Sequence, residues 1–373
     1  MFLFGIEHEV AFLNHRGKFA DFSCTSFKDF SPIIDMLPSY PGDYSQLRIG
    51  DAGIKKKRWY IEGFERFANS EKVIECVPKG IEIRTSIHHD ISSTIAELSE
   101  SFLLLRQAAS FLGFSPVLAS FNPYLTVFEP LPPLNDYELK RRNHYSRKQT
   151  LNIPMLSYGA DLNISVAGLS QEELIDMGRK LTYYSPYIIP FSFSSPFYQG
   201  GIWEGLSART FFRSEEKLPV MVFVNREEQL ASSFPDFTRM ARIPAEVSRI
   251  EFKACDCCDD FSIYAGLLAL LKGLILDQSL DGRADFPDKA LHQLSAKEGF
   301  DNLDIYGNAK ELLSAAEDAL DLDPDVELLT PLKVILEQRE SAAHELLWVL
   351  EKVGSIEEVL KHTYIAYDMT NLN

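Results

Sequence analysis

The sequence lacks an excess of positive charge. Its 373 residues include 37 Lys and Arg against 54 Asp and Glu, a net charge of -17. A chain this acidic has no general affinity for the phosphate backbone of nucleic acids or for anionic lipid surfaces. We therefore expect no nucleic acid and no membrane as a partner, and an anionic ligand would need local cations.

The sequence also lacks an apolar run long enough to cross a bilayer. The run from Tyr264 to Leu276 is interrupted by Lys272 and falls short of the roughly 20 residues that a spanning helix requires, so it predicts a buried helix. The first residues enter a strand pattern at once, without the basic start, apolar middle and small-residue cleavage site of a secretory signal. The expected location is therefore cytoplasmic.

Cysteine is scarce and unevenly placed. Three of the five cysteines crowd into "ACDCCDD", which suits reduced thiols better than a disulfide framework. A zinc site on this stretch is conceivable, but no spaced second Cys/His pair completes it, so ordinary thiols are favoured. Neighbouring aspartates would raise the thiol pKa values and disfavour thiolate chemistry. The five are Cys24, Cys76, Cys255, Cys257 and Cys258.

Neither a Gly-x-x-x-x-Gly-Lys-Ser/Thr loop nor a Gly-x-Gly-x-x-Gly loop is present, so ATP, if bound, would be held by metals and a sheet. Internal repeats are absent too, and strand and helix signals do not follow one another as regular βαβ units. These absences favour an α+β fold over a doubly wound or a repeat fold.

Hydrophobic periodicity predicts the elements. Alternation with period two predicts strands at 3–13, 80–87, 161–166 and 247–255, and a more buried strand at 218–224. Helices are expected at about 92–112 and 170–189, the second opening with a capping box of Ser170 and Glu173. The pattern beyond Asp259 is chiefly helical. We expect a catalytic domain over 1–275 and a helical part over 276–373 packed on it, as one catalytic unit.

The first strand raises the main question of the sequence. In "GIEHEVAF" Glu7 and Glu9 share one face, and the residues between and beside them take the other. Three further predicted strands carry polar residues on one face in the same way. These are Glu82 with Arg84; Asp161 with Asn163 and Ser165; and Arg249 with Glu251 and Lys253.

Two explanations of this polar face stay open. A half-exposed antiparallel sheet would carry charges on its wet face at little cost. Alternatively, carboxylates of like sign are held together by divalent cations, since Mg²⁺ accepts hard oxygen ligands and removes their repulsion. Glu75 could join such a site, because Pro78 and Gly80 allow a turn before Glu82. A solvated Glu75 fits the spacing equally well.

Four motifs in order carry a resemblance to a known family. They are "GIEHE", "IECVPKGIEIRT", "SSPFYQGGIWEGLSARTFFR" (194–213) and "RIEFKACD" (249–256). Together they resemble the glutamate–cysteine ligases and related carboxylate–amine ligases, whose catalytic domain is like that of glutamine synthetase. The whole chain is most similar to the cyanobacterial type.

The resemblance implies a curved, mainly antiparallel sheet with flanking helices and a helical C-terminal part. It also implies an ATP-dependent ligase that uses two or more Mg²⁺ ions and joins the L-glutamate γ-carboxylate to the L-cysteine amine. The product would be γ-glutamylcysteine, the precursor of glutathione. The implied route passes through γ-glutamyl phosphate and needs no protein nucleophile, so catalysis rests on placement and on cations.

The resemblance also implies residue roles. Glu7 and Glu251 resemble ligands of the metal at the ATP phosphates, and Arg209 resembles the arginine that meets the transferring phosphate or a substrate carboxylate. Glu9, Glu75 and Glu82 resemble ligands of a metal near the glutamate side chain. The full metal set is Glu7, Glu9, Glu75, Glu82, Asp161, Asn163 and Glu251; the nucleotide set is Glu7, Asn163, Glu251 and Arg209; the catalytic cations are Arg84, Arg209 and Lys253.

The chain departs from the family at three of these positions. Asp161 and Asn163 stand where relatives often have His-x-His; both offer oxygen to Mg²⁺, but asparagine brings no charge. Lys253 stands in place of an arginine, which keeps a cation and loses the bidentate fork.

Three rival functions stay open. The ligase could join glutamate to a different amine, because the carboxylate motifs do not identify the acceptor. The clustered carboxylates with His88, His89 and Asp90 could instead build a metal-dependent hydrolase, although a turn or the start of a helix explains "HHD" as well. A catalytically silent binding protein is the third. The sequence does not predict the oligomeric state.

Overall fold

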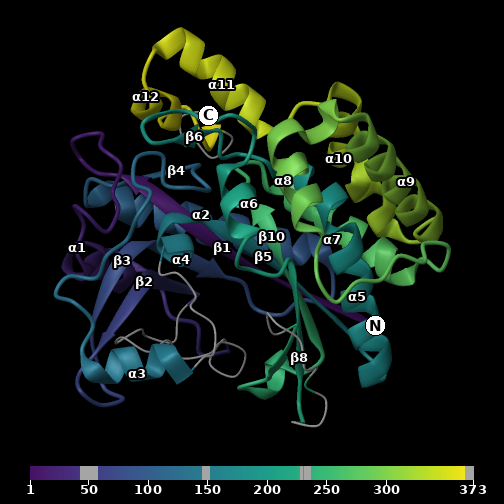
Figure 1. Cartoon of the computed structure of the whole chain (residues 1–373), viewed down its shortest axis with the longest axis horizontal. Helices are drawn as coiled ribbons and strands as arrows, with labels where there is room; N and C mark the ends of the chain where they lie inside the picture. Colours follow the sequence, from purple (N-terminus) through teal and green to yellow (C-terminus); the bar gives the residue numbers. More distant parts are fainter. Residues whose placement is uncertain (43–57, 145–151, 227–229, 231–236, 366–373) are drawn as a thin grey trace.

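A curled sheet forms the centre of the molecule (Figure 1). The computed structural model describes residues 1–42, 58–144, 152–226, 230 and 237–365. The strand order is β2-β3-β1-β5-β10-β8-β9, and β4 pairs with one end of β1. Apart from the parallel pair β8 and β9, neighbouring strands of this path are antiparallel. The expected mainly antiparallel sheet with flanking helices is confirmed.

The strands of this sheet are β1 (Phe2–Leu13), β2 (Trp59–Phe67), β3 (Val73–Arg84), β4 (Ser115–Val117), β5 (Gly159–Val166), β8 (Val220–Val224), β9 (Thr238–Met240) and β10 (Arg249–Asp256). A separate hairpin joins β6 (Phe197–Tyr198) to β7 (Gly201–Ile202). The prediction from periodicity omitted β2, which adds an edge strand outside β3.

Strand β1 lies at the middle of the sheet because one of its faces is almost entirely apolar. Ile6, Val10 and Phe12 are buried in the main core on that face. Helices α2 (Ile91–Phe111) and α7 (Phe261–Leu276) pack on this side of the sheet, and α1 (Phe27–Met36) packs on β2 and β3. The core therefore lies between the sheet and this helix layer, and the polar residues of β1 face the other side.

Helix α7 corresponds to the long apolar run, and the prediction of a buried helix is confirmed. All but three of its residues are buried, and its one charge, Lys272, is paired with Asp323 and Asp325 at 2.7 and 2.6 Å. Within the described ranges, none of the helices combines the length and hydropathy needed to cross a membrane.

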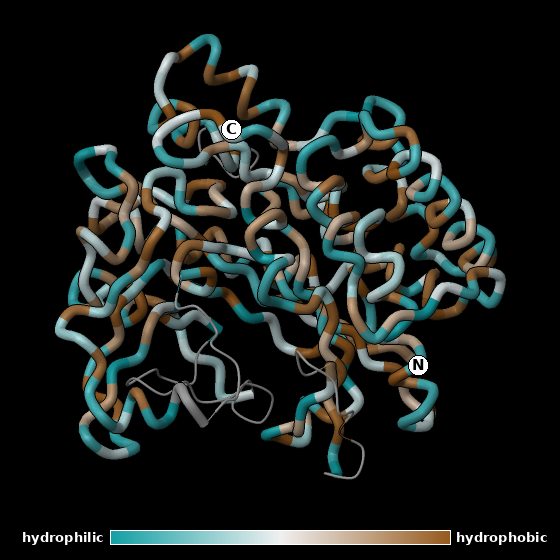
Figure 2. Tube along the Cα trace, viewed as in Figure 1, coloured by the Kyte–Doolittle hydropathy of each residue, from teal (hydrophilic) through white to brown (hydrophobic). Residues whose placement is uncertain are grey.

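Two of the C-terminal helices form a second layer outside α7. Helix α9 (Leu303–Ala319) packs on α7 and on α5 (Gln171–Ile188), and α10 (Thr330–Gln338) also contacts α7. These helices gather on one side of the molecule (Figure 1), where hydrophobic and hydrophilic residues alternate along each helix (Figure 2). The remaining helices of this part are α8 (Lys289–Glu298), α11 (Ala342–Val353) and α12 (Ile356–Leu360). The division into two domains at residue 275 stays a prediction.

Two helix starts position functional segments. Helix α5 begins with the capping box that was predicted at Ser170 and Glu173. Helix α6 (Ala208–Arg213) begins at Ser207, whose hydroxyl accepts a hydrogen bond from the backbone N–H of Thr210. Two further helices, α3 (Asp136–His144) and α4 (Asn152–Leu156), pack on β2.

Near the end of the described chain, Tyr364 lies in the core behind the central strand β1. The hydroxyl of Tyr364 lies 3.1 Å from Nε2 of His8, and the hydroxyl of Tyr264 lies 3.0 Å from Nδ1. Burial lowers the pKa of His8 to about 3, so its ring is neutral at ordinary pH. His8 therefore supports β1 from the face opposite to Glu7 and Glu9.

Candidate active site

Strand register brings the polar residues of five strands onto one face. Glu7 lies opposite Arg84 of β3 and opposite Asp161 of β5. Glu9 lies opposite Glu82 of β3, and Glu251 of β10 lies opposite Asn163 of β5. Residues directly opposite and diagonal to one another on the same face are in contact range. The pairing therefore makes one continuous acidic surface across β2, β3, β1, β5 and β10.

The first cluster, acidic group A, consists of Glu7, Asp161 and Glu251. One carboxylate oxygen from each lies within 4.8 Å of the others. A cation already contacts this group, because Lys253 Nζ lies 2.5 Å from Asp161 and also bonds to Glu251. Arg249 lies 3.7 Å from Glu7 and 3.6 Å from Glu251.

The charged side chains in and around group A shift one another's pKa values. Against the effect of burial, the cations of Lys253 and Arg249 lower the pKa of Glu251 to about 2. Burial raises the pKa of Asp161 to about 8; the charges of Glu251 and Glu7 add to the rise and Lys253 opposes it. Against burial again, Asp161 and Glu251 raise the pKa of Lys253. Group A thus holds a charged lysine between a carboxylate of lowered pKa, Glu251, and one of raised pKa, Asp161.

The second cluster, acidic group B, consists of Glu9, Glu62 and Glu82, again with oxygens within 4.8 Å of one another. Its direct cation contact is Lys79, whose Nζ lies 2.8 Å from Glu9. Burial and neighbouring carboxylates raise the pKa of Glu82, and burial raises that of Glu62 to about 7 although Lys79 opposes it. Group B therefore carries repulsion that the described cations do not offset.

Glu62 was missed by the prediction from sequence. It lies on β2, the strand that periodicity did not identify, and its diagonal neighbour across the pair is Glu82, since Glu62 lies opposite Gly80. A signal was present: Trp59 and Ile61 are buried in the core, and Tyr60 and Glu62 alternate with them. The same period-two argument applied to 59–67 would have placed Glu62 on the acidic face.

Glu75 is a correction to the expected metal set. It lies opposite Arg66 near the far end of the β2–β3 hairpin, is exposed, and belongs to neither acidic group. Four residues of strand lie between it and Gly80, and the chain does not turn there because β3 continues through both residues. The expected turn at Pro78 is absent. The residue beside Glu82 is therefore Glu62 and not Glu75.

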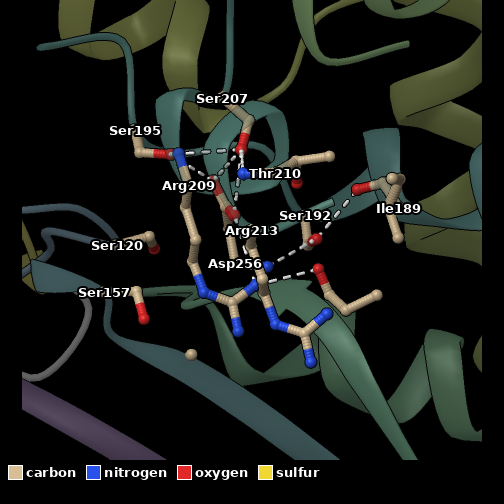
Figure 3. Close-up of polar contacts among 12 residues, drawn as sticks. Ser120, Ser157, Ile189, Ser192, Ser195, Ser207, Arg209, Thr210, Arg213 and Asp256 are labelled. Carbon is tan, nitrogen blue, oxygen red and sulfur yellow. Dashed lines mark hydrogen bonds and ion pairs between the residues drawn. The ribbon is translucent and has the colours of Figure 1, made fainter. Parts of the chain in front are cut away.

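Arg209 extends from α6 over the sheet (Figure 3). Its Nη1 donates to the carbonyl of Ala254 at 2.9 Å and its Nη2 donates to that of Lys253 at 3.1 Å. The close approach explains Gly159, because a Cβ there would lie 2.0 Å from Nη2 of Arg209. Backbone contacts on β10 therefore fix the guanidinium against Gly159 of β5.

A network around Asp256 holds the segment that carries Arg209. Asp256 is fully buried and accepts hydrogen bonds from the hydroxyls of Ser195 and Ser207 and from the backbone N–H of Ser194. Burial raises the pKa of Asp256 against the effects of Arg209 and these donors. Ser207 also caps α6, so the network sets where that helix begins.

The donor set fits magnesium better than zinc. Both acidic groups offer carboxylate oxygens alone, and hard oxygen ligands suit Mg²⁺. Two buried oxygens near them, Glu82 Oε1 and Asn163 Oδ1, have no hydrogen-bond partner in the described structure. Buried acceptors without donors carry a cost that a cation would relieve. The residues of both groups could therefore hold divalent cations.

The other candidate ligands lie elsewhere in the fold. Nε2 of His88 contacts Glu97 at 3.1 Å, Asp90 caps α2, and His89 is exposed. Burial raises the pKa of Cys255 to about 12, and Cys257 and Cys258 are buried thiols with raised pKa values. In the part of the chain that the structure describes, neither set forms a three-residue ligand group.

Comparison of the whole structure with solved structures identifies the fold class. The glutamate–cysteine ligase of Francisella tularensis in complex with AMP superposes with a TM-score of 0.59 at 11% identity, covering 100% of this chain and 90% of that one. A bifunctional glutathione synthetase from Pasteurella multocida gives a TM-score of 0.59 at 13% identity, covering 98% and 52%. At these identities the likeness shows the fold alone, which this chain shares with these two enzymes.

Sequence comparison then identifies the family. The model of glutamate-cysteine ligase family 2 matches residues 3–215, more than half of the chain, so the protein belongs to that family. A putative glutamate–cysteine ligase 2 of Janthinobacterium sp. is 28% identical over 191 residues, which is 47% of this chain and 50% of the relative. The chain thus matches about half the length of this curated relative. The predicted family resemblance is confirmed.

Proposed function

We propose that the protein is an ATP- and Mg²⁺-dependent ligase that joins the γ-carboxylate of L-glutamate to the amine of L-cysteine. One observation carries the proposal: two groups of three carboxylates converge from separate strands on one face of the sheet. Family membership, and the AMP complex of the Francisella tularensis enzyme, support the choice of a nucleotide-dependent ligase. The product is γ-glutamylcysteine, which serves glutathione synthesis.

Group A, with Asn163, is proposed to hold the cation that binds the nucleotide phosphates. Glu7, Asp161 and Glu251 supply oxygens there, and Asn163 faces the same surface directly opposite Glu251. Lys253 contacts two of the three carboxylates, so it must give way when a divalent ion binds. A flexible four-carbon stem allows that movement, and a displaced ammonium can meet a phosphate oxygen.

Group B is proposed to hold a second cation near the γ-carboxylate of the bound L-glutamate. Glu62 and Glu82 retain protons more readily than free carboxylates, so ion binding releases protons from them. Lys79 and the backbone N–H of Gly159 fix both oxygens of Glu9, at 2.8 and 2.9 Å. Bound Mg²⁺ would supply Lewis-acid polarisation and charge neutralisation at both groups.

The remaining cations are proposed to act on the transferring phosphoryl group. Arg209 is held by the backbone carbonyls of Lys253 and Ala254, and Arg84 lies opposite Glu7. In the proposed reaction a γ-carboxylate oxygen attacks the terminal phosphorus of ATP and ADP leaves; the cysteine amine then attacks the acyl carbon, and phosphate leaves. No protein nucleophile takes part, so the chain positions substrates and stabilises charge.

The proposal is tested by ADP release from ATP and Mg²⁺ with glutamate, with and without cysteine, followed by mass identification of the product. Glu7→Gln should abolish glutamate-dependent release and leave the fold intact, because it removes a ligand charge from group A. A panel of amines in place of cysteine tests the acceptor. Turnover that needs no nucleotide would point to a metal-dependent hydrolase and overturn the proposal.

A further inference from the structure

We propose that Lys79 is a positioning residue for acidic group B. It holds Glu9 in place before a divalent ion binds, and it stays on Glu9 when the ion is bound. The inference rests on the proposed function, since it takes group B to be an ion site of the ligase. Lys79 thus acts in the opposite way to Lys253, which an ion at group A displaces.

A β-bulge in β3 delivers the side chain of Lys79 to the acidic face. Ile81 is buried in the core, and strict alternation along the strand would send Lys79 to the same side. Two successive residues of β2 pair with Gly80 and Pro78, so in this described pair of strands no residue lies opposite Lys79. An extra residue of this kind bends a strand and changes the direction of a side chain. The ammonium of Lys79 accordingly reaches Glu9.

The local sequence suits the bulge. Pro78 has no N–H to donate to a neighbouring strand, and bulges are among the few places in a sheet that accept proline. A Cβ at Gly80 would lie 2.3 Å from the carbonyl oxygen of Val10, and one at Gly63 would lie 2.1 Å from that of Val77. Both positions therefore need glycine for the close approach of two backbones. This stretch encodes a bulge, where the sequence predicted a turn.

Lys79 is held at both of its ends by the segment that leads into β5. Its side chain is 2% exposed, and Nζ donates to Glu9 Oε1 at 2.8 Å and to the carbonyl of Ser157 at 2.7 Å. The hydroxyl of Tyr158 donates to the backbone carbonyl of Lys79 at 2.8 Å. Nζ also lies 5.3 Å from the centroid of the Tyr158 ring, within cation–π range. Lys79 therefore has one position fixed by several contacts.

These contacts fix Glu9 from two sides. Lys79 holds one of its oxygens, and the backbone N–H of Gly159 donates to the other at 2.9 Å. Glu9 lies opposite Glu82, and the like charges of the two would turn them apart if nothing held them. Partners that orient a ligand carboxylate raise its affinity for a metal ion. Lys79 thus keeps Glu9 directed into group B without an ion.

Lys79 differs from Lys253 in burial and in partners. The side chain of Lys253 is 28% exposed, and its ammonium contacts two carboxylates of group A. Lys79 has a backbone carbonyl as its second partner, and an ammonium that left these contacts would be buried without compensation. With Lys79 retained, the three ionised carboxylates of group B and one ammonium leave two negative charges. One divalent ion neutralises them.

The test is calorimetry of Mg²⁺ binding to the whole chain without nucleotide, for the wild type, Lys79→Met and Lys79→Gln. Binding that Glu62→Gln removes is assigned to group B. We expect group B of Lys79→Met to bind Mg²⁺ about 10-fold more weakly than the wild type. Lys79→Gln should lie between the two, because its amide can still donate to one partner. A lysine that only competed with the ion would give tighter binding in both variants.

Lys180→Met is the matched control. Lys180 is fully buried, and its Nζ contacts the carboxylate of Asp277 at 2.8 Å and the carbonyl of the same residue at 2.7 Å. It therefore has the same kinds of partner as Lys79, outside both acidic groups. Both Lys→Met variants should unfold at a lower temperature than the wild type in EDTA, but Lys180→Met should keep its Mg²⁺ affinity. If Lys79→Met does not fold, Lys79→Gln provides the comparison.

Unchanged or tighter Mg²⁺ binding at group B of the folded Lys79 variants overturns the proposal. So does wild-type binding that Glu62→Gln leaves unchanged. ADP release with glutamate is measured on the same samples. A wild type that binds Mg²⁺ at group B and releases no ADP would overturn the ligase function, and weaker Mg²⁺ binding by Lys79→Met would still support the role of Lys79.

Discussion

Acidic groups A and B have the same number of carboxylates but different cations around them. Group A contacts Lys253 and Arg249, and Lys253 already bridges two of its three members. Within the described part of the chain, group B contacts Lys79 through Glu9, and Glu82 keeps a buried oxygen without a partner. A divalent ion at group A must displace a lysine, whereas at group B it must displace protons. The same acidic face thus presents two ion sites. A divalent ion competes with Lys253 at group A and with protons at group B.

The largest effect is expected from a ligand of group A. Glu251→Gln keeps the shape of the side chain and removes its charge, so glutamate-dependent ADP release should fall by about 100-fold or more. Circular dichroism should show an unchanged fold. Substantial turnover by the folded variant would mean that group A does not serve the nucleotide.

Lys253→Gln tests whether Lys253 competes with Mg²⁺ for group A. Without its ammonium, Asp161 and Glu251 repel each other, so the metal-free variant should unfold at a lower temperature than the wild type. The rise in Tm on adding Mg²⁺ should be larger in the variant, because the ion no longer displaces a lysine. An unchanged response to Mg²⁺ would show that Lys253 does not compete for the site.

The membership of group B is tested by a pair of variants. Glu62→Gln should weaken Mg²⁺-dependent turnover about 10-fold or more, because it removes an oxygen charge from the group. Glu75→Gln should change turnover little, since Glu75 is exposed and lies beyond the group. ADP release at limiting Mg²⁺ measures both, and the reverse ranking would restore Glu75 as the ligand.

Because protons compete with a metal ion for group B, the stability of the protein should depend on pH. The folded-state pKa of Glu62 is raised from 4.5 to about 7, so the metal-free fold binds a proton that the unfolded chain loses. Its contribution to stability is therefore lost as pH rises through this range. Tm without metal should fall by a few degrees between about pH 5 and pH 8, and the gain on adding Mg²⁺ should grow.

The Glu62→Gln variant is the control for this pH profile. Because Asp161 shifts in the same direction, to about 8, the variant should flatten the profile only in part. A metal-free Tm that rises steadily from pH 5 to pH 8 in the wild type would contradict the assignment of raised pKa values to the acidic face.

The smallest effect is expected from a change behind both groups. Tyr364→Phe removes the hydroxyl that contacts His8, which lies between Glu7 and Glu9 on the opposite face of β1. It should cost about 1 kcal/mol of stability in chemical denaturation. Mg²⁺ responses at both groups should change equally, and a selective effect on one group would show that the two are not supported by the same strand.

Much of the fold and part of the site could be predicted from the sequence. The alternation in β1, β3, β5 and β10 placed Glu7, Glu9, Glu82, Asp161 and Glu251 on one face of the sheet, because a strand turns every second side chain the same way. The capping box at Ser170 and the buried helix α7 followed from local patterns as well. The prediction missed β2, the strand that carries Glu62. It expected a turn near Pro78 and therefore placed Glu75 beside Glu82, where Glu62 lies.

The sequence by itself determined which residues share a face within each strand, since side-chain alternation is a local property of the backbone. Tertiary structure alone decided which strands lie next to one another, and therefore that Glu62 meets Glu82 and that Asp161 meets Glu7. It also decided that Arg213 and Lys217 line one small pocket together with His292 of α8. These outcomes depend on strand order and register, which are set by the packing of segments far apart along the chain.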